Sequence, residues 1–132
     1  MRAKLSVLRA CRRLLRPGGR LGFYTIYIPP GLPEDAYRRA VLAGPEAVVS
    51  RRDHLPLLRS AGFANISETD VTPEFLRVAR TYLEARKRHA DELRRSEGDA
   101  EFDRMQVERR DRVAAIEAGL LRRSLFLARR PR

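Results

Sequence analysis

The spacing of apolar residues along this chain alternates between the period of a helix and the pattern of a strand. Segments in which apolar residues recur every three or four positions predict helices, and short apolar or alternating runs predict strands. The predicted helices cover residues 3–15, 34–43, 51–60, 73–95 and 100–118, and the predicted strands cover residues 21–28, 65–71 and 120–128. Elements in this order predict a single α/β domain over residues 1–132.

Residues 21–28 (LGFYTIYI) carry the clearest strand pattern. The segment is rich in β-branched and aromatic residues, and Pro29 and Pro30 end it. Because the run is almost continuously apolar, we expect burial on both of its faces, as in a parallel sheet covered by helices. In the second strand, we expect Ile66 and Val71 to be buried.

The first predicted helix places Val7, Cys11 and Leu14 on one apolar stripe. We expect this stripe to face the core, with Cys11 as a small buried hydrophobe. In the helix over residues 51–60, Ser50 is the expected N-cap and Asp53 its capping-box partner.

The longest predicted helix, residues 73–95, has Pro73 in its first turn and Thr72 as the expected cap. Its apolar stripe consists of Phe75, Val78, Tyr82, His89 and Leu93. A polar turn over residues 96–99 separates it from the helix over residues 100–118, whose apolar face consists of Phe102, Met105, Val113 and Ile116.

The net charge of +11 is concentrated at the two ends of the chain. Residues 1–20 hold seven basic side chains and residues 122–132 hold five, and neither segment holds an acidic one. A basic protein suggests a nucleic-acid ligand. Two observations argue against it: 26 of the 28 cations are Arg, as in high-GC coding sequences, and no aromatic residues are interleaved with the basic ends to stack on bases.

The same composition excludes several other classes. No apolar run is long enough to span a membrane, and Arg9, Arg12 and Arg13 interrupt the N-terminal segment, so it has no signal-peptide core. Cys11 is the single cysteine, which excludes an intrachain disulfide and a cysteine-cluster zinc site, and the two histidines form no metal signature. We expect a cytoplasmic protein without a bound metal.

Three segments carry a family resemblance. Residues 14–21 (LLRPGGRL), placed before a strand, resemble the helix-to-strand junction of class I S-adenosylmethionine-dependent methyltransferases. Residues 57–63 (LLRSAGF) resemble the junction before the next strand of that family, and residues 124–131 (SLFLARRP) resemble its last strand. The three landmarks occur in the family's order and cover nearly the whole chain.

The resemblance implies a partial Rossmann-like sheet. Its strands would correspond to the family's strands 5, 6 and 7, with the last one antiparallel and between the other two. Residues 72–118 would be a helical insertion, or lid, between the second and third strands. The chain would then be the C-terminal, acceptor-side half of a methyltransferase acting on a small molecule.

The family's Gly-rich cofactor loop has no counterpart. Gly18, Gly19 and Gly22 lie in a segment that runs from a helix into a strand, the opposite direction from a nucleotide-binding turn, so we interpret them as turn residues. The resemblance implies S-adenosylmethionine as the family's cofactor, and we expect that this chain alone neither binds it nor is active. No cofactor-binding or catalytic residue is assigned.

Four residues are candidates for binding the acceptor. Tyr24, Thr25 and Tyr27 lie at or near the carboxyl end of the first strand, the edge of an open α/β sheet at which ligands bind. His89 would face the site from the lid as a general base. The alternative for all four is packing or surface exposure, and His54, at a helix start, is expected to be exposed.

A half sheet leaves residues 21–28 with an unpaired edge. We expect this edge to form a homodimer, to pair with a separate cofactor-binding half, or to make the chain poorly soluble, and we expect the first helix to expose part of its packing face. Two other functions stay open: a non-catalytic interaction or regulatory module derived from a methyltransferase, and, less favoured, an Arg-rich nucleic-acid binder.

Overall fold

The computed structural model describes residues 2–45 and 54–132 and contains a three-stranded sheet with the order β1-β3-β2. The strands are β1 (Arg20–Tyr27), β2 (Ala64–Asp70) and β3 (Arg122–Arg129). Both β1 and β2 pair with β3 in the antiparallel sense and are therefore parallel to each other. The prediction that the last strand lies between the other two, running against them, is confirmed.

The helices of the described residues are α1 (Arg2–Leu14), α2 (Glu34–Ala43), α3 (His54–Ser60), α4 (Thr72–Arg88), α5 (Ala90–Glu97) and α6 (Asp99–Glu117). The predicted strands and helices are present, with ends within two residues of the prediction, apart from the division of the helix over residues 73–95 described below. Residues 51–53 of the third predicted helix lie outside the described residues. Ser50 and Asp53, predicted to cap the third helix, lie outside the described residues.

The prediction of one continuous helix over residues 73–95 is wrong. Residues 73–95 form two helices, α4 and α5, which separate at His89. Of the predicted turn over residues 96–99, only Gly98 is outside a helix, because residues 96 and 97 end α5 and Asp99 begins α6. Neither Gly nor Pro lies near His89, so no local pattern indicates a break at this residue. Gly98, at φ 90°, then turns the chain into α6.

Two apolar clusters lie on different sides of the sheet. In the first, α1 and α3 cover one face of β3, and the buried members are Leu8, Leu57, Leu58, Ala61, Phe63, Phe126 and Ala128. In the second, α2, α4 and α6 meet where β1 ends and β3 begins, and the buried members are Ile28, Ala40, Ala43, Phe75, Ala115, Ile116, Leu120 and Leu121. The two clusters together contain buried residues from all of the described helices except α5.

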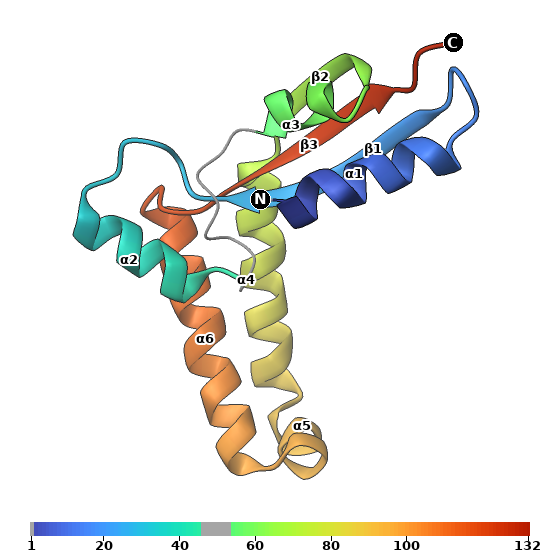
Figure 1. The fold of residues 1–132 in the computed structure, drawn as a ribbon. Coiled ribbons are helices and arrows are strands. Elements are labelled where there is room, and N and C mark those ends of the chain that lie inside the picture. The colour runs from blue at the N-terminus through green and yellow to red at the C-terminus, as the bar shows by residue number, and fades with distance from the viewer. Residues whose placement is uncertain (1, 46–53) are drawn as a thin grey trace.

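The helices α4, α5 and α6 form an arm that projects away from the sheet (Figure 1). Its first turn depends on Asp70, whose carboxylate accepts hydrogen bonds from the Thr72 backbone N–H (2.9 Å) and the Thr72 hydroxyl (2.5 Å). The prediction that Thr72 is the cap is therefore wrong: Thr72 is the first residue of α4, Val71 is the N-cap, and the Asp70 side chain accepts the hydrogen bonds from Thr72. Pro73 lies in the first turn, as predicted.

Several predicted apolar faces differ in detail. On α1, Val7 and Leu14 are 60% and 88% exposed and Cys11 is half-buried, because the helix packs through Leu8 instead. This confirms that the first helix exposes part of its apolar surface. On α4, Phe75 is buried, but Val78, Tyr82 and His89 are exposed, because Leu83 and Arg86 face α6.

The remaining predicted faces are only partly buried. Leu93 on α5 and Met105 and Val113 on α6 are intermediate in exposure, whereas Phe102 and Ile116 are buried as predicted. In the second strand, Ile66 and Val71 are also intermediate rather than buried.

The strand β1 is not buried on both faces. Its exposed and half-buried residues alternate, and Tyr24 is 58% exposed, because helices cover only one face along most of its length. β1 pairs with β3 on one side, and no described residue pairs with its other edge. The predicted free edge is therefore present.

Candidate functional site

The structure brings two of the four predicted site residues to one cavity. Tyr24 and Thr25 line a cavity of about 280 Å³ between α1 and β1. Tyr27 is not part of its lining, and His89 lies at the break between α4 and α5, at the end of the arm away from β1 (Figure 1). The four residues therefore do not form one site.

This α1–β1 cavity is mostly apolar. Its lining consists of Lys4, Val7, Leu8, Cys11, Leu21, Phe23, Tyr24, Thr25 and His54. On the exposed face of β1, the Arg123 guanidinium carbon lies 4.2 Å from the centre of the Tyr24 ring, a cation–π contact that helps to position the phenol.

His54 is the residue that sequence reasoning missed. It was expected to be exposed, yet it is 9% exposed, and its Nε2 lies 3.3 Å from the Thr25 hydroxyl oxygen. Its ring lies among aromatic side chains, 6.3 Å from the Phe23 ring centre and 5.6 Å from that of Phe126. The reason is helical spacing: His54 shares the face of α3 that carries Leu57 and Leu58, and this spacing is visible in the sequence.

The Thr25–His54 pair gives the apolar cavity one polar corner. An imidazole beside a hydroxyl can hold a polar ligand group or accept a proton. We therefore regard the α1–β1 cavity as a candidate for binding a largely apolar group.

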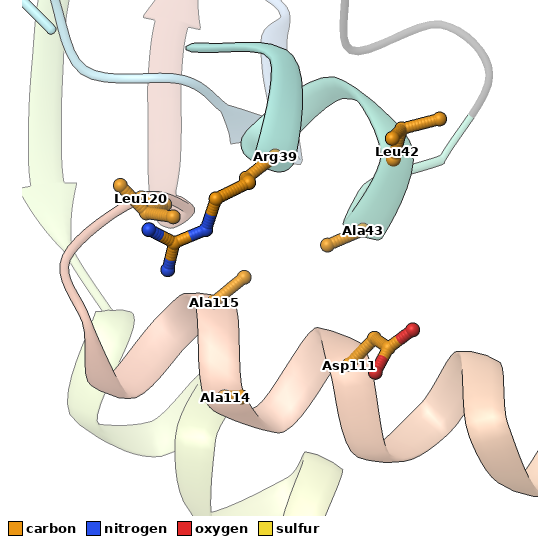
Figure 2. Close-up of a pocket in the computed structure, with 7 residues that line it drawn as sticks. All are labelled: Arg39, Leu42, Ala43, Asp111, Ala114, Ala115 and Leu120. Carbon is orange, nitrogen blue, oxygen red and sulfur yellow. The ribbon is translucent and has the colours of Figure 1, made fainter. Parts of the chain in front are cut away.

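A second cavity of about 280 Å³ lies between α2 and α6 (Figure 2). It is lined by Arg39, Leu42, Ala43, Asp111, Ala114, Ala115 and Leu120. The loop after β1 leads into α2, and Leu120 directly precedes β3. The cavity therefore lies toward the sheet edge where β1 ends, and none of the predicted site residues lines it.

An arginine of α6 contacts the end of α2 beside this second cavity. Arg112, whose side chain is 14% exposed, donates from Nε to the Ala43 carbonyl oxygen at the end of α2 (3.2 Å). Burial lowers the pKa of the Arg112 guanidinium below its ordinary value, the positive charge of Arg109 adds to this effect, and Glu108 opposes it.

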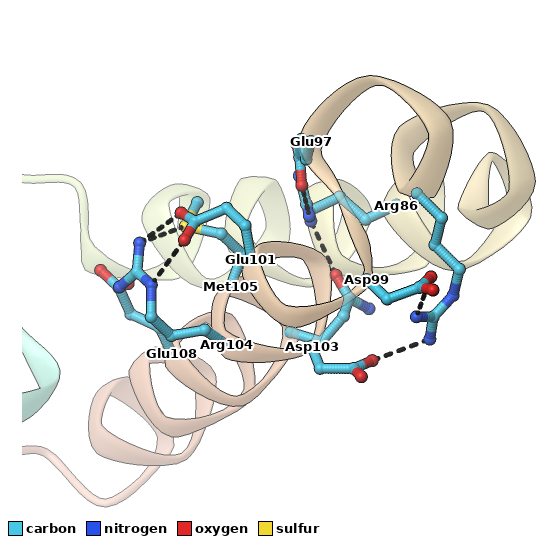
Figure 3. A network of polar contacts seen from close by, with 10 residues as sticks. Arg86, Glu97, Asp99, Glu101, Asp103, Arg104, Met105 and Glu108 are labelled. Carbon is cyan, nitrogen blue, oxygen red and sulfur yellow. Dashed lines mark hydrogen bonds and ion pairs between the residues drawn. The ribbon is translucent and has the colours of Figure 1, made fainter.

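A polar network inside the arm serves the structure of the arm (Figure 3). The Arg86 side chain, 5% exposed, donates to both carboxylate oxygens of Glu97 (2.9 and 2.8 Å) and to Gln106 Oε1 (2.7 Å), and it stacks on Phe102. Its hydrogen bonds lower the pKa of Glu97 and raise that of Arg86. All of these donors and acceptors are satisfied within the arm.

The described residues offer neither a metal site nor a membrane-spanning helix. Among residues 2–45 and 54–132, no group of three or more His, Cys, Asp or Glu side chains is arranged to hold a metal ion. No helix in these same ranges has both the length and the apolar character needed to cross a membrane.

Comparison with known proteins gives one relative in sequence and several in structure. No protein-family model matches the chain. A 27-O-demethylrifamycin SV methyltransferase from Amycolatopsis mediterranei (strain S699) is 44% identical over 70 residues, which cover 50% of this chain and 26% of that protein.

The solved structures resemble nearly the whole chain. Haemonchus contortus phosphoethanolamine N-methyltransferase 2 in complex with S-adenosyl-L-methionine has a TM-score of 0.80 at 15% identity, covering 97% of this chain and 30% of that one. A Galdieria sulphuraria protein assigned as a sarcosine dimethylglycine methyltransferase has a TM-score of 0.80 at 14% identity, covering 97% and 47%. The chain thus spans between about a quarter and a half of the length of these proteins.

Proposed function

We propose that this chain, which has part of the fold of an S-adenosylmethionine-dependent methyltransferase, supplies the acceptor side of a methyl-transfer reaction. The observation that carries the proposal is the sheet order β1-β3-β2 with an antiparallel central strand, which superimposes on methyltransferases over 97% of the chain. The sequence identity to a rifamycin methyltransferase supports the same activity.

In this proposal, residues 1–132 are the C-terminal half of the fold, and residues 72–118 are a lid beside the acceptor. The arm is joined to the sheet at the ends of β2 and β3, so its base lies next to the edge where β1 ends. The acceptor is a small molecule, as the names of the related methyltransferases suggest. Tyr24 and Thr25, with His54 behind them, form one wall available to it.

The described residues do not fit S-adenosylmethionine. A nucleotide-type cradle needs a Gly-rich turn from a strand into a helix, whose backbone N–H groups face the ligand. The glycines of this chain do not provide one: Gly18 and Gly19 connect α1 to β1, and the Gly18 N–H donates to the Arg130 carbonyl oxygen (2.8 Å). We therefore derive no chemical step through the cofactor from these residues.

The cofactor would be held by a separate half that pairs with the free edge of β1. An edge strand presents unpaired N–H and C=O groups, which favour the addition of another strand. A second copy of this chain could occupy the same edge and would compete with that half.

The proposal is tested by calorimetry with S-adenosylmethionine on three proteins. The first is the chain itself, the second is the rifamycin methyltransferase truncated to remove its structurally equivalent part, and the third is a chimera in which this chain replaces that part. We expect heat of binding for the chimera only. Methyl transfer to 27-O-demethylrifamycin SV by the chimera would extend the result to catalysis.

Two outcomes would contradict the proposal. A chimera that folds but does not bind S-adenosylmethionine would favour a non-catalytic interaction module. Salt-sensitive retention of the chain on DNA or RNA would favour a nucleic-acid binder, because the affinity of such proteins falls steeply with salt. Binding of the cofactor by the 132-residue chain alone would overturn the division into two halves.

A further inference from the structure

The α2–α6 cavity combines an apolar lining with a cationic side chain at one end. Figure 2 shows Arg39 reaching from α2 toward Ala115 and Leu120, whereas Asp111 lies toward the other end of the cavity. Three alanines and two leucines supply most of the remaining lining, and their small size leaves the volume of about 280 Å³.

The charge of Arg39 is not compensated within the part of the chain that the structure describes. Its neighbour Arg38 lies 3.6 Å from Glu34, but none of the ion pairs or side-chain hydrogen bonds found there includes Arg39. Arg112 brings a second guanidinium to the end of α2, where it contacts the Ala43 carbonyl oxygen and lies 3.8 Å from Glu108. Asp111 is the one carboxylate in the cavity lining.

The position of the cavity also suits a ligand. In open α/β sheets, ligands bind outside the carboxyl ends of the strands, and α2 is the first helix after the carboxyl end of β1. The base of the cavity belongs to the buried cluster that contains Ala43, Ala115 and Leu120, so the packed core fixes its shape.

We propose that this cavity binds a small organic anion, with the Arg39 guanidinium holding a carboxylate or phosphate and the alanine and leucine side chains covering the hydrocarbon part. A planar guanidinium can donate two parallel hydrogen bonds to either anion. An apolar cavity of about 150 Å³ is enough for benzene, so this cavity has room for a ring and its anionic substituent.

The inference deepens the proposed function in one respect. The claim that the anion is part of the methyl acceptor rests on the proposed function, because it requires that this chain forms the acceptor side of a methyltransferase. The binding itself does not depend on it, since neither S-adenosylmethionine nor a second half is needed for Arg39 to hold an anion. The two claims can therefore fail separately.

The test is a nuclear magnetic resonance titration of the 132-residue chain with benzoate, phenyl phosphate and the neutral analogue benzamide. We expect saturable shifts of the Arg39 Nε–H and of the Ala114 and Ala115 amides with at least one of the two anions. The anion with the lower Kd shows whether the cavity prefers a carboxylate or a phosphate. Benzamide should bind about 10-fold more weakly or worse, because it has no negative charge and only one oxygen to accept the two parallel hydrogen bonds of the guanidinium.

Variants sharpen the test. Arg39→Ala should weaken anion binding about 10-fold or more, while the matched control Arg38→Ala should leave it unchanged. Arg39→Lys should lie between the two, because it keeps the charge and loses the planar fork. Asp111→Asn should strengthen binding, since it removes the one negative charge of the lining.

Three results would overturn the inference. The first is equal affinity for benzoate and benzamide, and the second is unchanged anion affinity in Arg39→Ala. The third is a set of shifts confined to α1 and the C-terminal arginines, which would mean non-specific attraction of anions to the basic ends. Arg39→Gln replaces Arg39→Ala if the alanine variant loses the dispersed spectrum of a folded protein.

Discussion

The sheet flank and the helical arm use arginine in opposite ways. We define the sheet flank as α1, β1 and residues 122–132, and the arm as α4, α5 and α6. In the arm, arginines form ion pairs with carboxylates on the same helix or its neighbours, such as Arg80 with Glu117 (2.9 Å) and Arg94 with Asp103 (2.8 Å). Across the described residues of the sheet flank, no arginine forms an ion pair.

The arginines of the sheet flank bind backbone carbonyl groups instead. Arg130 donates to the Arg12 carbonyl oxygen (3.0 Å) and to that of Leu15 near the end of α1, and Arg12 donates to the Gly62 carbonyl oxygen (3.3 Å). In β1 and β3, Arg20 and Arg129 are cross-strand partners of like charge. The fold thus brings the two basic ends of the chain together without a counter-charge.

The two regions differ in how many of their charged groups, apolar side chains and backbone groups have partners within the chain. In the arm, many cations form ion pairs with carboxylates of the arm itself, although the buried Nε of Arg109 has no hydrogen-bond partner among the described residues. The sheet flank instead keeps cations without ion pairs, exposed apolar residues and an unpaired strand edge. A surface with these three properties is suited to a polypeptide partner that adds a strand, covers apolar side chains and presents carboxylates.

The largest effect is expected inside the arm. Arg86→Ala leaves Glu97 and Gln106 without their donor, and we expect the free energy of unfolding to fall by about 2 kcal/mol, below the cost of breaking a fully buried pair because Glu97 is partly solvated. Urea unfolding followed by circular dichroism measures it. Arg104→Ala is the matched control, because its ion pairs with Glu101 and Glu108 are exposed and should contribute nothing measurable.

Equal stability of the two variants would contradict the view that Arg86 holds the arm together. If Arg86→Ala unfolds the arm while the sheet stays folded, amide exchange will accelerate in α5 and α6 but not in β3. That result would show that the arm is a separate cooperative unit.

The next effect concerns the flank. An exposed apolar residue beside an unpaired strand edge favours association, so we expect the chain to self-associate at micromolar concentration and Val7→Glu to raise the Kd about 10-fold. Analytical ultracentrifugation measures it. Val107→Glu is the control, since Val107 on the arm is similarly exposed. A monomeric wild-type chain, or equal effects of both substitutions, would remove the distinction between flank and arm.

The two regions also differ in how far the sequence predicted them. The sheet order followed from the family landmarks, and the free edge followed from that order. In the arm, no local pattern marks the break at His89, since neither Gly nor Pro lies near it. The buried Arg86 lies on the face of α4 that packs against α6, although buried helix faces are usually apolar. Because the prediction followed apolar residues alone, it placed Tyr82 on the buried face, where the structure has Leu83.

The candidate site was predicted less well than the fold. Tyr24 and Thr25 line a cavity because the strand carries both to one place, which the topology allowed us to expect. His89 was assigned by the same helical period that failed on α4. The α2–α6 cavity arises where two helices far apart in the sequence meet, and helical periods do not show such a meeting. His54 could have been predicted from its spacing to Leu57 and Leu58.

The smallest effect is expected at the joint between sheet and arm. Asp70 accepts two hydrogen bonds from Thr72, and these bonds lower the pKa of the Asp70 carboxyl below its ordinary value, with Arg122 adding to the effect. A carboxyl whose folded pKa is lowered stabilises the fold above its unfolded pKa, about 3.9, and this stabilisation is lost as the pH falls through the folded pKa.

We therefore expect Asp70→Ala to reduce the free energy of unfolding at pH 7 by about 0.5–1 kcal/mol, the usual cost of losing a helix cap. The difference from the wild type should shrink as the pH falls below about 3.9. Urea unfolding at pH 7 and in the acid range measures both values. Asp70→Asn should recover part of the stability at pH 7, because its side-chain oxygen still accepts the Thr72 N–H. If the difference in the free energy of unfolding stays constant with pH, the Asp70 side chain stabilises the joint through the geometry of its hydrogen bonds and not through its charge. The joint would then depend neither on ion pairs, as the arm does, nor on unpaired cations, as the flank does.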